Sequence, residues 1–304
     1  MLFWLLSLLF LSQLSLNFSS YDPLVIHTTS NQTELPINLK FEAINGYEMA
    51  TVQGGEVIDL TYIKSLVTPD EAKRLVNICD DRGGWVISPQ KGNNNDHDGF
   101  EENNARSSSS CPLIWPMLYL ARYDDLKAAG KLTKQIENEL NLSWSLTQRF
   151  SELFDIPVSR FEPFQLIRYE MGQRYKQHHD HGEYYGLSDA PRSTTLLIFL
   201  SDVKSAGGET NFPALKLKVE PRQGSGIIWN NVRDIDEVEV VQHADGSTKS
   251  RYGRIIQEAI HEGLPPMRSD SATHNDVMVK YAMNVWIREE EIDNLDKEAY
   301  KTKG

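Results

Sequence analysis

Basic residues, cysteines and long apolar runs are all scarce in this chain of 304 residues. Lysine and arginine number 31 against 43 aspartates and glutamates, and the net charge is −12. A surface that follows nucleic-acid phosphates needs clustered positive charge, so this balance argues against nucleic-acid binding. There are two cysteines, whose spacing matches no zinc motif. Without repeats and with 40% hydrophobic residues, the chain is predicted to form one large folded domain with appendages.

The longest apolar run covers residues 2–16, where Gln13 and several serines interrupt it. A membrane-spanning helix needs ~20 apolar residues, so the run favours a secretory signal peptide within residues 1–19. An uncleaved membrane anchor is the alternative, because the positive charges typical of a signal peptide are missing. Asn17, Asn31 and Asn141 each begin an Asn-x-Ser/Thr triplet, which agrees with the secretory pathway. We therefore expect the endoplasmic reticulum as the location.

The two cysteines, Cys79 and Cys111, leave two alternatives open. In an oxidising lumen they could form a disulfide bridge. Cys79 also fits the apolar stripe of a predicted helix, where it would be a buried free thiol.

Organisation along the chain predicts an α+β domain with a double-stranded β-helix (jelly-roll) core. Residues 20–56 are polar and read as a tail or a loosely attached strand, and the domain is predicted to span 57–290. Its part from 57 to 156 shows helical patterns, beginning with a capping box at Thr68 and Glu71. From 157 to 290 the patterns are those of strands, which the N-terminal helices would buttress. Residues 291–304 form a charged tail.

His178 and Asp180 form the most informative short motif. Side chains two positions apart share a face of a strand, so both could bind one metal ion while His179 points away. A third ligand from another strand would complete the two-histidine, one-carboxylate triad typical of Fe(II) oxygen chemistry. Taken alone, the pair is weak evidence, because a His-x-Asp that arises by chance on a polar turn and binds no metal is the more frequent case.

Lys280 occupies an unusual place in the last apolar strand. It shares one predicted face with Ala282, Asn284 and Trp286. If that face is buried, the ammonium group needs an anionic partner to offset its desolvation, whereas on an edge strand it would lie in water.

Several segments, in order, resemble the prolyl 4-hydroxylase family of Fe(II)- and 2-oxoglutarate-dependent dioxygenases. The resemblance covers about Val57 to Arg288 and is tightest from Tyr169 to Trp229. Its motifs are RYEMGQRYKQ (168–177), the His178–Asp180 pair, RSTTLLIFLSDV (192–203), GGETNFP (207–213), PRQGSGIIWNN (221–231) and KYAMNVWIR (280–288).

The resemblance implies roles for individual residues. His261 lies in a His-x-Gly-x-Pro segment and would be the third iron ligand beside His178 and Asp180. The stretches on either side of it are longer than usual and contain His243 and His274 as alternatives. Lys280, Tyr169 and Thr195 would bind the distal carboxylate of 2-oxoglutarate. Tyr175 and Trp286 would line a peptide groove, and Arg106, in a segment similar to the family's Arg-Thr-Ser, would contact substrate.

The implied activity is hydroxylation of peptidyl proline to 4-hydroxyproline, with O2 consumed and 2-oxoglutarate decarboxylated to succinate and CO2. Fe(II), 2-oxoglutarate, O2 and L-ascorbate would be the cofactors and cosubstrates. The partner would be a proline-containing polypeptide, and some relatives pair with a disulfide-isomerase-type subunit whereas others act alone. Hydroxylation of another side chain or a small molecule is an alternative, and a non-catalytic β-helix binding module is another.

Overall fold

The computed structural model describes residues 26–30, 33–36, 39–53, 58–88, 106–117, 123–181, 191–203, 206–233, 239–242, 248–251, 255–268 and 279–292. Within these ranges the elements are β1 (Ile26–Ser30), β2 (Thr33–Pro36), β3 (Glu42–Ile44), β4 (Tyr47–Gln53), β5 (Leu60–Ile63), α1 (Pro69–Asp81), β6 (Val86–Ile87), β7 (Ser109–Pro112), α3 (Tyr123–Ala128), α4 (Lys134–Phe154), η1 (Val158–Arg160), β8 (Gln165–Tyr169), β9 (Tyr175–His178), β10 (Arg192–Phe199), β11 (Ala206–Gly207), β12 (Thr210–Phe212), η2 (Pro213–Leu215), β13 (Leu217–Val219), β14 (Gly226–Asn230), β15 (Glu239–Gln242), β16 (Thr248–Arg251), η3 (Gln257–Ala259), β17 (His261–Gly263), β18 (Pro266–Met267) and β19 (Lys280–Arg288).

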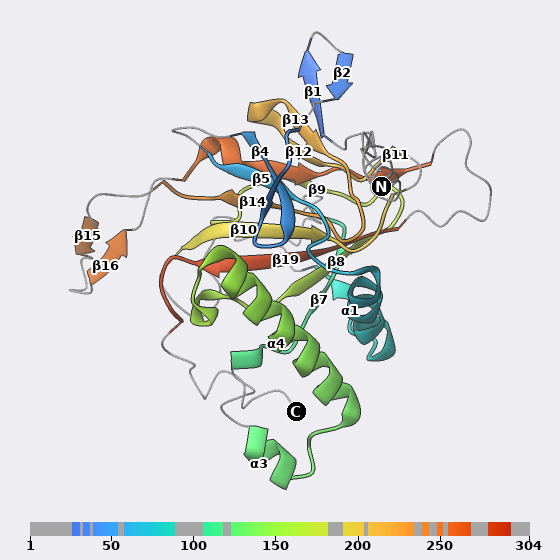
Figure 1. The fold of residues 1–304 in the computed structure, drawn as a ribbon, viewed down its shortest axis with the longest axis vertical. Helices are drawn as coiled ribbons and strands as arrows, with labels where there is room; N and C mark the ends of the chain where they lie inside the picture. The colour runs from blue at the N-terminus through green and yellow to red at the C-terminus, as the bar shows by residue number, and fades with distance from the viewer. Residues whose placement is uncertain are drawn as a thin grey trace, which may run out of the picture.

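Two antiparallel sheets form the core. The larger has the order β3-β4-β5-β14-β10-β19-β8-β7-β6, and the smaller has the order β2-β1-β13-β12-β17-β9. They lie one above the other in Figure 1, with the helices beneath the larger sheet. Neighbouring strands are mostly distant in the sequence, as β14, β10 and β19 show. This arrangement confirms the predicted double-stranded β-helix with helical support.

The central strands of the larger sheet are buried on both faces. Along β19, Met283, Val285 and Ile287 belong to a core shared with the helices, whereas Ala282 belongs to a second core between the sheets. The period-two assignment of this strand is therefore confirmed. Leu197 and Phe199 of β10 join the same inner core.

The helices pack against the outer face of the larger sheet, as predicted. Thr68 caps α1 in a complete capping box with Glu71, and Thr133 caps α4. The side chain of Leu75 in α1 and that of Phe150 in α4 are both fully buried in the outer core. The helical pattern over 118–129 corresponds to α3, although residues 118–122 lie outside the described ranges.

Cys79 of α1 and Cys111 of β7 form a disulfide, which settles the alternatives left open by the sequence. The bridge fastens the first supporting helix to a strand of the larger sheet. Within the ranges that the structure describes, no helix combines the length and the apolar character needed to cross a membrane.

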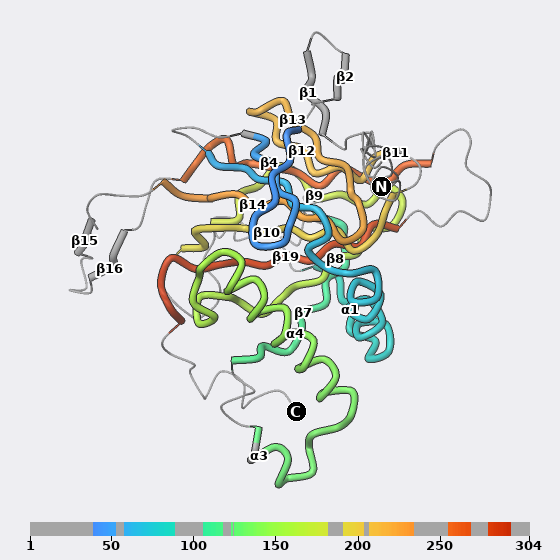
Figure 2. Tube along the Cα trace, viewed as in Figure 1, coloured from blue at the N-terminus to red at the C-terminus, as the bar shows by residue number. Residues whose placement is uncertain are grey.

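The larger sheet begins earlier than the predicted boundary at residue 57. β3 and β4 form a hairpin, and β4 pairs with β5 inside that sheet, as the blue part of the trace in Figure 2 shows. Asn45 and Gly46 make its two-residue turn, both with positive φ. Asn-Gly between two strands is a strong hairpin signal that the sequence interpretation did not use.

Some sequence predictions fall outside the described residues. The N-terminal apolar run at 2–16, most of the charged tail at 291–304, and the alternative ligands His243 and His274 are among them.

Candidate active site

His178 and His261 lie directly opposite each other on neighbouring strands. β9 and β17 pair antiparallel, with His261 aligned to His178, and the two ring centroids lie 4.3 Å apart. Directly opposite residues in an antiparallel pair project to the same face, so the register brings the two imidazoles together.

Asp180 completes a cluster of three groups suited to hold a metal ion. One ligand atom from each of His178, Asp180 and His261 lies within 4.8 Å of the others. Asp180 Oδ1 lies 3.6 Å from His178 Nε2, and Asp180 Oδ2 lies 3.7 Å from His261 Nε2. The prediction that one strand carries both members of the pair is wrong, because β9 ends at His178 and Asp180 lies in the bend that follows. The bend nevertheless directs the carboxylate to the histidines, and His179 is exposed.

Backbone carbonyls orient both imidazoles. His178 Nδ1 lies 2.8 Å from the carbonyl oxygen of Lys176, and His261 Nδ1 lies 2.9 Å from that of Ala259. Since a carbonyl only accepts hydrogen bonds, each Nδ1 carries the proton. Each Nε2 therefore remains as the ring atom that faces Asp180 and can bind a metal.

The electrostatic surroundings favour the protonation states that ligands need. Burial, together with the neighbouring His261, lowers the pKa of His178 to about 3, so the ring is neutral at pH 7. Burial alone would raise the pKa of Asp180, but His261, His178 and Arg192 outweigh it, and the pKa falls to about 2. Asp180 is therefore an anion beside the neutral ring of His178.

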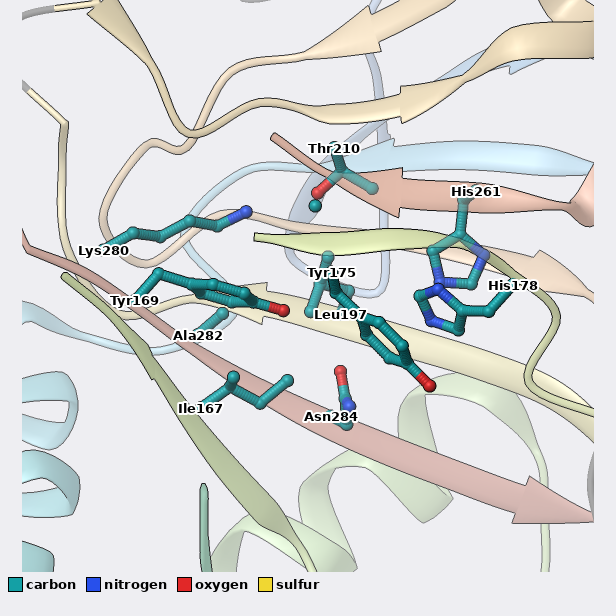
Figure 3. A pocket seen from close by; sticks show the side chains of 11 residues that line it. Ile167, Tyr169, Tyr175, His178, Leu197, Thr210, His261, Lys280, Ala282 and Asn284 are labelled. Carbon is teal, nitrogen blue, oxygen red and sulfur yellow. The ribbon is translucent and has the colours of Figure 1, made fainter. Parts of the chain in front are cut away.

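A cavity of about 30 Å³ extends from the histidines to Lys280 (Figure 3). Lys280 lies at one end and His178 and His261 at the other, with Tyr175 between them. The cavity is lined by Ile167, Tyr169, Tyr175, His178, Leu197, Thr210, His261, Gly263, Lys280, Ala282 and Asn284.

Lys280 is buried, with 2% of its surface exposed. Burial lowers its pKa from 10.5 to about 8, although nearby Glu209 opposes this shift. Within the described part of the chain, its Nζ lies 5.4 Å from the Tyr169 ring centroid and 5.5 Å from that of Phe199. The ammonium is therefore placed to bind an anion in the cavity.

Two hydroxyl groups lie at the Lys280 end. Tyr169 is opposite Lys280 in the β8–β19 register, and burial raises its pKa to about 12, so it is a neutral donor. Thr210 Oγ1 is buried and makes no hydrogen bond, and Figure 3 shows it on the Lys280 side of the cavity. The sequence interpretation quoted the segment GGETNFP but assigned no role to Thr210.

Thr195 does not lie with Lys280, contrary to the prediction. It pairs with Trp286 in the β10–β19 register, six residues from Lys280 and therefore about 20 Å along the strand. Its hydroxyl donates to Asp180 Oδ2 at 3.0 Å instead. The structure thus assigns Thr195 to the metal end of the site.

The three predicted substrate contacts lie around this metal end. The Tyr175 ring stacks on that of His178 at a centroid distance of 3.5 Å, and the Arg106 guanidinium lies 4.7 Å from the Tyr175 centroid. Trp286 is buried and does not line the cavity. Its indole packs under Arg192, at 3.7 Å from the guanidinium carbon.

Arg192 was missed by the sequence interpretation. It makes two hydrogen bonds of 2.8 Å to the buried carboxylate of Glu162, which also accepts from Arg288 Nε at 2.6 Å. This arrangement fixes Arg192 over Trp286. An arginine at a strand start carries no sequence signal for such a role, because Glu162 comes from another part of the chain.

The long stretch before His261 does not disturb the barrel register. Val232 and Ile255 form a bridge at its base, and the amide of Ile256 donates to the carbonyl of Asn231 at 3.0 Å. These contacts return the chain to η3 and β17, so His261 reaches the cluster as predicted. The predicted alternatives His243 and His274 lie outside the described residues.

Residues 164–288 match the model of the 2OG-Fe(II) oxygenase superfamily. The matched range contains the metal cluster, Lys280 and the strands that carry them. These residues are therefore similar to a 2OG-Fe(II) oxygenase domain.

Curated relatives of this oxygenase domain are named prolyl 4-hydroxylases. Prolyl 4-hydroxylase 13 from Arabidopsis thaliana is 27% identical over 174 residues, which are 52% of this chain and 54% of the relative. Prolyl 4-hydroxylase subunit alpha-1 from Gallus gallus is 33% identical over 93 residues, or 29% of this chain and 18% of the relative. The chain spans about half the length of the first of these relatives.

Among solved structures, a similar one is the viral collagen prolyl hydroxylase of Paramecium Bursaria Chlorella virus-1 in its 2OG complex. The TM-score is 0.47 at 20% identity, and the match covers 77% of this chain and 97% of that chain.

The residues present fit the metal and cosubstrate of a 2OG-Fe(II) oxygenase. Two imidazoles and one carboxylate are the donor set that non-haem Fe(II) favours. At the other end of the cavity, the ammonium of Lys280 and the unpaired hydroxyl of Thr210 suit a carboxylate.

Proposed function

We propose that this protein is an Fe(II)- and 2-oxoglutarate-dependent dioxygenase that hydroxylates peptidyl proline to 4-hydroxyproline. One observation carries the proposal: a single cavity joins a His-Asp-His cluster to a buried lysine within the oxygenase domain. The names of the curated relatives support proline as the substrate.

His178, Asp180 and His261 would hold Fe(II), and Lys280 with Thr210 and Tyr169 would hold the distal carboxylate of 2-oxoglutarate. When bound, the two groups supply the oxidising chemistry, in which O2 is consumed, 2-oxoglutarate yields succinate and CO2, and one oxygen atom enters a substrate C–H bond. The protein residues fix the positions of both groups. Apolar Ile167, Leu197 and Ala282 limit water access along the cavity between them.

Substrate would approach at the metal end, where Tyr175 and Trp286 offer aromatic faces to a proline ring. Tyr175 is held by its stack on His178, and Trp286 is held by Arg192. Arg106 and Arg192 would provide donors for peptide carbonyl groups beside the ring.

The test is to incubate the protein, purified without O2 and loaded with Fe(II), with proline-rich peptides, 2-oxoglutarate and O2. Mass spectrometry should find hydroxylated proline, and succinate should form in equal amount. Ascorbate should extend turnover by keeping the iron reduced. Hydroxylation of a different residue would retain the chemistry but overturn proline as the substrate, and absence of succinate would overturn the enzyme assignment.

We also propose that the protein resides in the lumen of the endoplasmic reticulum. The Cys79–Cys111 disulfide supports an oxidising compartment, and Asn141 of its glycosylation triplet is exposed on α4. Expression in a eukaryotic cell should give a glycan removable by an endoglycosidase and absent from Asn141→Gln. A protein that has no glycan, and in which Cys79 is reduced, would contradict this location.

A further inference from the structure

A chain of three buried hydrogen bonds ends on the carboxylate of Asp180. The Trp229 Nε1–H group donates to Asn231 Oδ1 at 3.0 Å. Asn231 Nδ2 then donates to Thr195 Oγ1 at 2.8 Å, and Thr195 Oγ1 donates to Asp180 Oδ2 at 3.0 Å. Trp229 and Asn231 are 1% exposed and Thr195 is fully buried, so bulk water cannot substitute for any of these partners.

The chemistry of Trp229 fixes the direction of the whole chain. An indole nitrogen can only donate, so the Asn231 side chain must present its oxygen to Trp229 and its amide group to Thr195. The Thr195 oxygen therefore accepts from Asn231, which leaves its own proton for Asp180. The orientations of the Asn231 amide and of the Thr195 hydroxyl therefore both follow from the indole N–H group, which can only donate.

Trp229 and Asn231, at the end of β14, also support His261. The Trp229 ring meets the His261 ring edge to face at a centroid distance of 4.9 Å. The carbonyl of Asn231 accepts from the amide of Ile256, which begins the turn that contains Ala259, the residue that orients His261 Nδ1. One short segment thus contacts the surroundings of two of the three proposed ligands.

We propose that Thr195 and Asn231 are positioning residues for the metal centre, with Trp229 setting their orientation. The hydroxyl of Thr195 holds Asp180 Oδ2, which fixes the carboxylate rotamer and leaves Oδ1 directed toward His178. This inference rests on the proposed iron site. Loss of a hydrogen bond to a metal-binding carboxylate typically weakens metal binding about 10- to 100-fold.

The test measures binding of Fe(II) alone, without O2 or cosubstrate, to the metal-stripped full chain by calorimetry. Thr195→Val keeps the side-chain shape and removes the hydroxyl, and it should raise the dissociation constant about 10- to 100-fold. Thr195→Ser keeps the hydroxyl and should restore affinity close to that of the parent. Thr194→Val is the matched control, because Thr194 lies on the opposite face of the same strand. This variant should bind Fe(II) as the parent does.

Melting of each metal-free variant separates positioning from folding. Fe(II) binding is compared well below the melting temperature. If Thr195→Val does not fold, Thr195→Ala replaces it. Unchanged Fe(II) affinity in a folded variant without the hydroxyl, or equal weakening in Thr194→Val, would overturn the positioning role. Failure of the parent itself to bind Fe(II) would instead overturn the proposed metal centre.

Discussion

At the scale of single residues, Lys280 is the group on which the proposed binding of 2-oxoglutarate depends most. A buried ammonium costs free energy unless an anion accompanies it, and the cavity offers room for one beside Thr210 and Tyr169. The lysine therefore contributes to binding more than to stability.

Lys280→Ala should raise the apparent KM for 2-oxoglutarate far more than the KM for peptide. A charge-assisted hydrogen bond contributes roughly 1.5–3 kcal/mol, equivalent to about ten- to more than hundred-fold weaker binding. Initial rates at varied 2-oxoglutarate, with peptide fixed at saturation, measure the effect. An unchanged dependence on 2-oxoglutarate would remove Lys280 from the cosubstrate site.

The affinity for 2-oxoglutarate should depend on pH through the same residue. Burial lowers the pKa of Lys280 to about 8, so the free protein loses the ammonium proton as pH rises through that value. Because the anion binds the charged form, affinity should fall about tenfold per pH unit above the pKa, which corresponds to one proton taken up on binding. Binding titrations on the Lys280→Ala variant should lack this slope, and an equal slope in both proteins would contradict the assignment.

At the scale of elements, one face of β19 serves two parts of the proposed reaction. Lys280 at its start faces the cosubstrate end, and Trp286 lies six residues on, opposite Thr195 at the metal end. The other face packs on the helices through Met283, Val285 and Ile287. This central strand would therefore set the separation between the proposed cosubstrate and substrate sites.

Trp286→Ala should impair peptide hydroxylation while sparing peptide-independent decarboxylation of 2-oxoglutarate. The reason is that Trp286 packs under Arg192 at the metal end and does not line the cavity that contains Lys280. Succinate release with and without a proline-rich peptide separates the two activities. If both activities fell together in a soluble, folded variant, Trp286 would have a packing role and the groove assignment would be abandoned.

The sequence predicted best those elements whose pattern lies in consecutive residues. The capping box at Thr68 and the alternation along β19 are visible in consecutive residues, and both are present in the structure. The positions of Thr195 and Thr210 have no such local signal, because each is a buried threonine on a strand. Only the pairing of Thr195 with Trp286 shows that it lies far from Lys280. Register between distant strands depends on tertiary packing, so a single sequence could not settle it.

At the scale of the whole molecule, the disulfide joins helix α1 to strand β7 of the larger sheet across a separation of 32 residues. The Cys79→Ala, Cys111→Ala double variant should lose about 3–4 kcal/mol of unfolding free energy, because the unfolded chain gains the freedom of that loop. Urea unfolding of the variant, the oxidised parent and the reduced parent measures this loss. Unfolding midpoints that coincide in oxidised and reduced parent would show that the bridge adds no stability.

The whole proposed function depends on one metal centre, in which His178, Asp180 and His261 together would hold iron. The most direct measurement is Fe(II) binding and peptide-dependent succinate release by alanine variants of each, beside His179→Ala. Loss of both properties is expected in the three ligand variants, with native folding by circular dichroism. His179→Ala should retain both, because His179 is exposed and does not belong to the cluster. If iron binding and succinate release persisted in His261→Ala, this three-residue metal centre would be contradicted.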